Sequence, residues 1–269
     1  MSFLVTNGVR THYQRLPPKN APCSPAPQVV FVHGLGYDSL ASFYLTLASP
    51  VAAAGFDVLT YDLRGHGRSD RPARGYRLAD FVADLRELID GIGISEPVHL
   101  VGNSFGGTIA FRFAAAYPER VASIVAIEAE PATPLWSEKM ARALNGVVDG
   151  MEAERYLAWV EDTFGHHHAR LAAAAAEVIR ATSIVQDVPS GPAHDDAQLA
   201  RLMAPVLSIV GSEGFQSEDL HGLERMLPRC ETAVVDGQDH SVLVARHHEI
   251  RPVILDWIAR VHVEARAVR

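Results

Sequence analysis

Cysteine is nearly absent from this sequence. Cys23 and Cys230 are the only two among 269 residues, and they form no Cys-x-x-Cys pair. A disulfide framework is therefore unsupported, and we expect two unpaired thiols in a reducing cytoplasm. Residues 3–5 are also too few for the apolar core of a secretion signal, and no small-residue cleavage site follows them. These absences predict a cytoplasmic protein.

Long apolar runs and clusters of basic residues are absent as well. Apolar runs such as 98–101 and 124–127 have the length of strands, far below the ~20 residues of a membrane-spanning helix. The 24 basic residues are outnumbered by 32 acidic ones, for a net charge of -8. A nucleic-acid-binding protein normally has a basic face, so this class is excluded. We expect a small-molecule substrate as the partner, and neither nucleic acid nor membrane.

Short apolar or β-branched segments recur along the chain, and each is bounded by turn residues. An Asn7-Gly8 pair between two β-prone runs predicts an N-terminal hairpin over residues 3–13. The proline-rich residues 17–27 fit neither a helix nor a central strand. Further strands are predicted at residues 29–32, 57–61, 98–101, 123–127, 206–210 and 232–235.

Helical patterns fill the intervals between these strands. Residues 78–89 carry an apolar stripe at helical spacing, residues 105–117 form a mostly apolar helix before a proline, and residues 248–263 form the last helix. Alternation of strand and helix predicts the α/β class. We expect a mostly parallel, right-handed sheet with helices on both faces and an antiparallel N-terminal hairpin.

Residues 131–205 interrupt the alternation, because they contain helical patterns and no convincing strand. A helical insertion between two strands is best interpreted as a lid over the carboxyl edge of the sheet, where open α/β sheets bind ligands. Trp136, Met140 and Trp159 are candidate substrate-binding residues in it, although most bulky side chains of a lid form the core of the lid itself. The aromatic and methionine content of the insertion suggests a substrate of moderate size and largely apolar character.

The strongest chemical motif lies in residues 102–106, which match Gly-x-Ser-x-Gly between a predicted strand and a predicted helix. The turn is so sharp that side chains two residues before and after Ser104 would collide, so glycine is needed at 102 and 106. The Ser104 hydroxyl then projects at the N-terminus of a helix, whose dipole favours developing negative charge. We interpret Ser104 as a nucleophile.

The sequence resembles the α/β-hydrolases, specifically the lid-bearing branch with haloalkane dehalogenases, epoxide hydrolases and serine esterases. Four segments carry the resemblance: HGLG at 33–36, YDLRGHGRSD at 61–70, GNSFG at 102–106 and DGQDH at 236–240. It extends over the whole chain except the insertion. It implies an eight-stranded sheet, a core domain of residues 1–130 and 206–269, and a lid of residues 131–205 before the last two strands.

The resemblance also implies roles for particular groups. The backbone amides of Leu35 and Phe105 correspond to the family's oxyanion-hole donors, and loss of one such donor typically costs ~3 kcal/mol. His240 occupies the position of the catalytic histidine and can exchange a proton with serine at neutral pH. We interpret His33 as a residue that ties loops together and 62–70 as a structural loop.

The catalytic acid departs from the usual family pattern. Most members place it after the strand that follows the lid, in Gly-x-x-Asp, whereas residues 211–214 here read GSEG with glycine at that position. Glu213 is one residue early on a probable surface turn. Glu128 ends the strand before the lid, a position that some dehalogenase-like relatives use. We favour Glu128, with Glu213 as the alternative and Glu130 as a weaker third.

These residues predict a cofactor-independent serine hydrolase that cleaves an ester, thioester or lactone through an acyl-enzyme. A serine nucleophile argues against dehalogenation and epoxide opening, which need a carboxylate. Carbon–carbon bond hydrolysis, a ring-closing or isomerising reaction, and a non-catalytic ligand receptor are the alternatives. No metal is expected, because the consecutive histidines 166–168 cannot all face one ion from a helix, and His247 and His248 have no carboxylate at ligand spacing.

Overall fold

A computed structural model describes residues 2–19 and 26–267 of the chain, which leaves Cys23 outside the described residues. Eight strands form one sheet in the order β1-β2-β4-β3-β5-β6-β7-β8. The two pairings of β2 are antiparallel and the other five are parallel. The strands are β1 (Ser2–Thr6), β2 (Val9–Leu16), β3 (Gln28–Val32), β4 (Asp57–Tyr61), β5 (Val98–Asn103), β6 (Val121–Ile127), β7 (Val206–Gly211) and β8 (Cys230–Val235).

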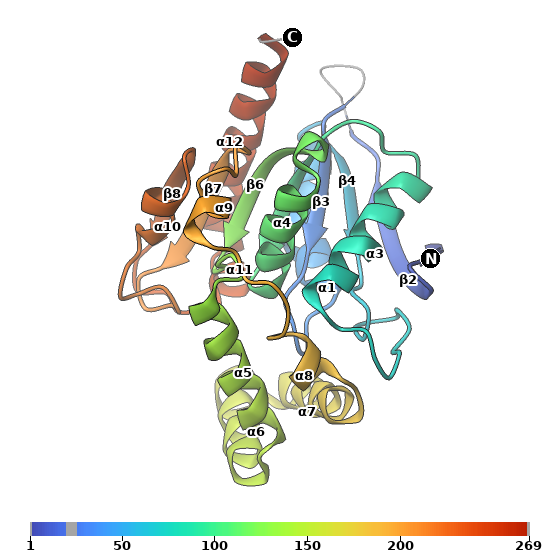
Figure 1. Ribbon diagram of the computed structural model, residues 1–269, viewed down its shortest axis with the longest axis vertical. Coiled ribbons are helices and arrows are strands. Elements are labelled where there is room, and N and C mark those ends of the chain that lie inside the picture. The colour runs from blue at the N-terminus through green and yellow to red at the C-terminus, as the bar shows by residue number, and fades with distance from the viewer. Residues whose placement is uncertain (1, 20–25, 268–269) are drawn as a thin grey trace.

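Helices occupy the connections between these strands (Figure 1). Those of the sheet region are α1 (Leu40–Phe43), the π-helical η1 (Tyr44–Ala48), α2 (Ser49–Ala53), α3 (Leu78–Gly91), α4 (Phe105–Ala116), the 3-10 helix η2 (Pro118–Arg120), α10 (Gly222–Met226), α11 (Val242–Ala245) and α12 (His247–Ala267). Those between β6 and β7 are α5 (Pro134–Val148), α6 (Gly150–Phe164), α7 (His166–Ala181), α8 (Ile184–Asp187) and α9 (Asp196–Leu199).

The sheet is apolar on both faces, so each face forms its own core. Alternate residues of β3 show this: Val30 and Val32 pack with α3 and α4, whereas Val29 and Phe31 pack with α1, η1, α2 and α12. Helices on both faces suit parallel strands, which are buried from both sides. The predicted α/β class with an eight-stranded, mostly parallel sheet is confirmed.

The helical stretch from α1 to α2 was not predicted from the sequence. Phe43, Leu47 and Val51 are fully buried and recur at a spacing of four, which is a helical stripe. Three short elements share this stripe, one of them π-helical, and the proline at position 50 lies in the first turn of α2. The pattern was therefore present, but it was short and interrupted.

The segment between β6 and β7 lies beyond the end of the sheet where the parallel strands finish. Figure 1 shows α5 to α8 grouped below the sheet, with the chain returning past α4 to α9. No strand occurs in the described residues of 131–205. Part of the segment joins the core of the α3–α4 face, through Trp136, Leu144 and Ile179 among others.

The loop after β4 is held by the buried carboxylate of Asp62. It accepts hydrogen bonds from the backbone amides of Leu40 and Arg68, and it contacts Nδ1 of His12 at 2.7 Å. Gly67 has a φ of 48°, and a side chain there would overlap the Asp62 carboxylate. Residues 62–70 therefore form a rigid polar unit against β2 and α1.

Four buried histidines are held neutral by the surrounding protein. Burial is the main cause that lowers the pKa of His33, His66 and His194 to about 4 and that of His99 to about 3. Since their ordinary pKa is near 6.5, the unfolded chain binds protons at a pH where the folded chain does not. Their contribution to the free energy of unfolding is therefore complete above about pH 6.5. It is lost as the pH falls from there toward the folded-state pKa values of about 4 and about 3.

We predict that His99→Gln makes the free energy of unfolding less dependent on pH. Between about pH 6 and pH 4 the slope should fall by ~1.4 kcal/mol per pH unit, the value for one proton taken up on unfolding. Urea unfolding at several pH values measures it. His167→Gln is the matched control, because that ring is exposed. An unchanged slope in His99→Gln would show that the buried ring is not held neutral.

Among the described residues, no helix has the length and apolarity needed to cross a membrane.

Candidate functional site

Ser104 sits on a strained turn between β5 and α4. Its φ is 51°, a left-handed value that a non-glycine residue adopts only when the surrounding structure imposes it. A side chain at Gly102 would overlap the backbone at the start of α4, and one at Gly106 would overlap the carbonyl groups of Val32 and His33. The two glycines therefore allow the turn to press against β3, which leaves the Ser104 side chain at the carboxyl edge of the sheet.

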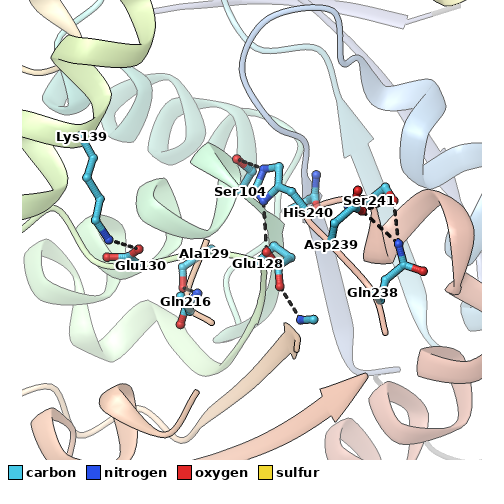
Figure 2. Close-up of polar contacts among 12 residues, drawn as sticks. Ser104, Glu128, Ala129, Glu130, Lys139, Gln216, Gln238, Asp239, His240 and Ser241 are labelled. Carbon is cyan, nitrogen blue, oxygen red and sulfur yellow. Dashed lines mark hydrogen bonds and ion pairs between the residues drawn. The ribbon is translucent and has the colours of Figure 1, made fainter. Parts of the chain in front are cut away.

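His240 lies in the loop after β8 and faces Ser104. Its Nε2 is 3.0 Å from the Ser104 hydroxyl oxygen. The loop is braced on the other side, where the Asp239 carboxylate accepts hydrogen bonds from the Ser241 amide and from the Gln238 side chain (Figure 2). The imidazole is thus fixed by its own loop at hydrogen-bonding distance from the serine.

Glu128 follows the last residue of β6 and completes the row of polar groups. One carboxylate oxygen lies 3.2 Å from Nδ1 of His240, and the other accepts a hydrogen bond from the Gly211 amide. The Glu128 side chain is 0% exposed, whereas that of His240 is 33% exposed. Figure 2 shows His240 between Ser104 and Glu128. An ionised carboxylate only accepts, so it holds the proton on Nδ1 and leaves Nε2 to accept from serine.

The backbone of Glu128 is also left-handed, with a φ of 49°. This turn aims the side chain from β6 across the end of β7, where Gly214 lies. A side chain at Gly214 would overlap both oxygens of the Glu128 carboxylate. The Glu128 carboxylate therefore occupies the space that a side chain at position 214 would need, so glycine at 214 is required for Glu128 to reach His240.

The other two candidate acids lie elsewhere. Glu213 is exposed, and its backbone amide donates to the carbonyl of Gln238. Glu130 forms an ion pair with Lys139 at 3.1 Å (Figure 2). Neither carboxylate contacts His240 in the structure.

The loop after β3 presents the Leu35 amide between two amides that are already engaged. The Gly34 amide donates to the Asp38 carboxylate at 3.0 Å, and the Gly36 amide donates to Nε2 of His66 at 3.1 Å. Leu35 is thus held from both sides by side-chain acceptors. The Phe105 amide, at the first position of α4, has no acceptor within its helix because of that position.

Asp38 and His66 were missed as site residues in the sequence. Burial raises the pKa of Asp38, although Ser42 and Asn103 donate hydrogen bonds to it. Burial lowers the pKa of His66 to about 4, so its ring is a neutral acceptor, with Nδ1 donating to the carbonyl of Arg64. The only available signal was the place of His66 in the 61–70 segment, which we interpreted as structural.

The aromatic and methionine candidates of the insertion occupy different environments. Trp136 is 7% exposed and stacks on Phe105, with ring centroids 6.3 Å apart. Met140 is half-buried against the same core. Trp159 is exposed on α6. Trp136 therefore packs behind the nucleophile turn, whereas Trp159 lies at the surface.

One aromatic contact at the site and one nearby pair of tyrosines were not foreseen. The Phe215 ring lies 4.1 Å from the His240 ring, centroid to centroid, yet it is exposed. Burial, followed by the nearby Tyr156 of α6, raises the pKa of Tyr37 to about 12. Tyr37 belongs to the loop that carries Leu35, so α6 reaches the rim of the site. Exposed aromatic rings around a polar centre are typical of a surface that meets an apolar ligand.

Metal ligands do not gather in the described part of the chain. Within residues 2–19 and 26–267, no three or more histidine, cysteine or acidic side chains are placed to hold a metal ion.

Comparison with known proteins identifies the family of this fold. Residues 27–200 match the family described as alpha/beta hydrolase fold. A 2-(acetamidomethylene)succinate hydrolase of Mesorhizobium japonicum is 29% identical over 248 residues, which cover 85% of this chain and 84% of the relative. A non-heme chloroperoxidase of Streptomyces lividans is 31% identical over 169 residues, or 61% of this chain, and the match spans only about half (51%) of that relative's length.

Solved structures show the same fold at low sequence identity. A carboxylesterase of Bacillus subtilis has a TM-score of 0.73 at 24% identity and covers 96% of this chain and 90% of its own. A meta-cleavage product hydrolase of Pseudomonas fluorescens has a TM-score of 0.73 at 21% identity, with 97% and 98% covered.

Proposed function

The chain belongs to the alpha/beta hydrolase family, and we propose that it is a cofactor-independent serine hydrolase. Its substrate would be an ester, thioester or lactone of moderate size and largely apolar character, cleaved through an acyl-enzyme. The observation that carries the proposal is the row of contacts from Ser104 through His240 to the buried Glu128. A nucleophile, a base within hydrogen-bonding distance and a group that orients the base are the parts such a mechanism needs.

In the proposed mechanism, the Ser104 oxygen attacks the carbonyl carbon while Nε2 of His240 takes the hydroxyl proton. The Glu128 carboxylate stabilises the imidazolium that forms. The imidazolium then returns the proton to the leaving group, and the acyl-enzyme remains. Water attacks this ester with His240 again as the base, which releases the acid and restores the serine.

The Leu35 and Phe105 amides are the proposed donors to the oxyanion of the tetrahedral intermediate. Their support is positional, because the amides on both sides of Leu35 are engaged and the Phe105 amide begins α4. A helix N-terminus also carries a partial positive charge that favours the oxyanion. Asp38 and His66 act as positioning residues, since each fixes one end of the loop that presents Leu35.

We propose that residues 131–205 form the lid of this site and that its apolar rim receives the substrate. Tyr156 and Trp159 of α6 contact each other, with ring centroids 6.0 Å apart, and Tyr156 lies near Tyr37. Phe215 covers one side of His240. An apolar acyl or alcohol part of the substrate would pack against these rings, because ligand sites are lined mainly by apolar and aromatic side chains.

Carbon–carbon bond hydrolysis is the second candidate, because the fold also matches that of a meta-cleavage product hydrolase. The same serine, histidine and acid serve that class of reaction. A panel of p-nitrophenyl esters with different acyl lengths, a lactone and a β-diketone separates the two candidates. Cleavage of the β-diketone alone would favour the second.

We predict that Ser104→Ala abolishes turnover and labelling by a fluorophosphonate probe while the protein remains folded. Loss of the nucleophile typically reduces turnover by ~10⁶-fold. Thermal unfolding checks the fold, and Ser212→Ala, on the loop after β7, is the control that keeps labelling. Labelling that persists in Ser104→Ala would contradict the proposal, because the probe would then be modifying another residue. A wild-type protein that the probe does not modify would also contradict it, because Ser104 would then be unreactive.

We predict further that Glu128→Gln lowers turnover by ~10⁴-fold, as expected when an amide favours the wrong histidine tautomer. Glu213→Gln should change turnover by only a small factor, because Glu213 is exposed and does not contact His240. Both variants are compared on one ester at equal folded concentration. A large loss in Glu213→Gln beside a nearly normal Glu128→Gln would move the acid to the loop after β7.

A further inference from the structure

A cavity lies beside α4, apart from the row of Ser104, His240 and Glu128. Its volume is about 400 Å³, and its walls come from the start of α3, the middle of α4, the start of α5 and residues 188–193. These last residues belong to the chain that returns from the insertion past α4 (Figure 1). Ser104, Glu128 and His240 are not among the lining residues. We call it the lateral cavity.

Two arginines give the lateral cavity its charge. Arg112 of α4 is half-buried, and within the described part of the chain its guanidinium has neither an ion pair nor a hydrogen bond. Arg77, just before α3, lines the same cavity and is exposed. Arginine is the residue of choice for pairing with carboxylates in partly buried sites, and the unpaired guanidinium of Arg112 has its donors available to a ligand.

The neighbouring groups offset this charge only in part. His194 is 2% exposed, and burial together with the charge of Arg112 lowers its pKa to about 4, so its ring is neutral. The Asp187 carboxylate interacts with Arg77 through space, but it also accepts hydrogen bonds from the amides of Gly75 and Tyr76. The lining residues of the lateral cavity thus include two arginines and no acidic residue.

The remaining lining is mostly apolar. Leu78, Val188 and Trp136 form its larger side chains, and Ser137 and Ser190 add hydroxyl groups. A cavity of this volume suits a small organic molecule. Arginine side chains among an otherwise mostly apolar lining match a carboxylate attached to an apolar body, because guanidinium and carboxylate form paired, charge-assisted hydrogen bonds.

We propose that the lateral cavity binds a small organic carboxylate. Arg112 and Arg77 hold the carboxylate, and the apolar body lies against Leu78, Val188 and Trp136. The ligand bridges α3 and α4 of the sheet domain to the chain returning from the insertion. It also touches Trp136, which stacks on Phe105 beside Ser104. The site does not depend on the proposed hydrolase activity.

Calorimetric titration of the whole protein with 4-phenylbutyrate tests the proposal. We expect binding to wild type, and binding weaker by about tenfold or more in Arg112→Gln, since a charge-assisted hydrogen bond is lost. The neutral 4-phenylbutyramide should bind weakly to both. Arg170→Gln is the matched control, an exposed arginine of α7. If Arg112→Gln does not fold, Arg77→Gln replaces it, with the same expected direction.

Two further arms separate the lateral cavity from the catalytic centre and from a site for inorganic anions. Ala79→Phe fills the cavity from its exposed edge and should abolish binding, whereas Ser104→Ala should keep it. Inorganic phosphate should bind more weakly than 4-phenylbutyrate, because it leaves the apolar wall uncovered. Unchanged affinity in both Arg112→Gln and Ala79→Phe, loss of binding in Ser104→Ala, no binding to wild type, or tighter binding of phosphate would each overturn the proposal.

Discussion

The contact between the buried carboxylate of Glu128 and the half-exposed imidazole of His240 sets the requirements for the rest of the site. A carboxylate without solvent exposure is costly unless it is paired and hydrogen bonded. Here the Gly211 amide and His240 supply the partners. The pairing of β6 with β7 brings residues 128 and 211 together, and a left-handed backbone at Glu128 turns its side chain across that pairing. The pairing of β6 with β7, the left-handed backbone of Glu128 and the glycine at 214 together allow this contact to form.

A second polar system holds the loop that carries Leu35. The loop of Leu35 is held by Asp38 and by His66, and His66 belongs to the rigid unit built on Asp62. Residues 62–70, which we interpreted from the sequence as a structural loop, also reach the site through the side chain of His66. Burial keeps His66 neutral, and only a neutral imidazole accepts from the Gly36 amide. The scaffold and the site thus share residues that no single motif describes.

The sequence predicted what depends on local patterns. Strand segments of four or five residues, the stripe of α3 and the glycines around Ser104 are properties of short segments, so they could be identified without the structure. Glu128 could be proposed only as one of three acids, because the choice depends on a register between β6 and β7 and on the space at Gly214. His66 and Phe215 lie far along the chain from Gly36 and His240, which they contact. Asp38 is close in the chain to Gly34, but its hydrogen bond to that amide follows from the folded loop. The unpaired charge of Arg112 is likewise visible only in three dimensions.

The exchange of positions 128 and 214 tests most directly whether one buried acid beside His240 organises this site. Ester turnover is measured for Glu128→Ala and for Glu128→Ala combined with Gly214→Asp, after both are shown to unfold cooperatively. The account predicts that the second substitution restores turnover by about tenfold or more over Glu128→Ala alone, because the new carboxylate takes the vacated place. Gly214→Asp on its own should lower turnover, since two carboxylates then compete for one space. Nearly normal turnover in Glu128→Ala, or no gain from the added Asp, would contradict the account.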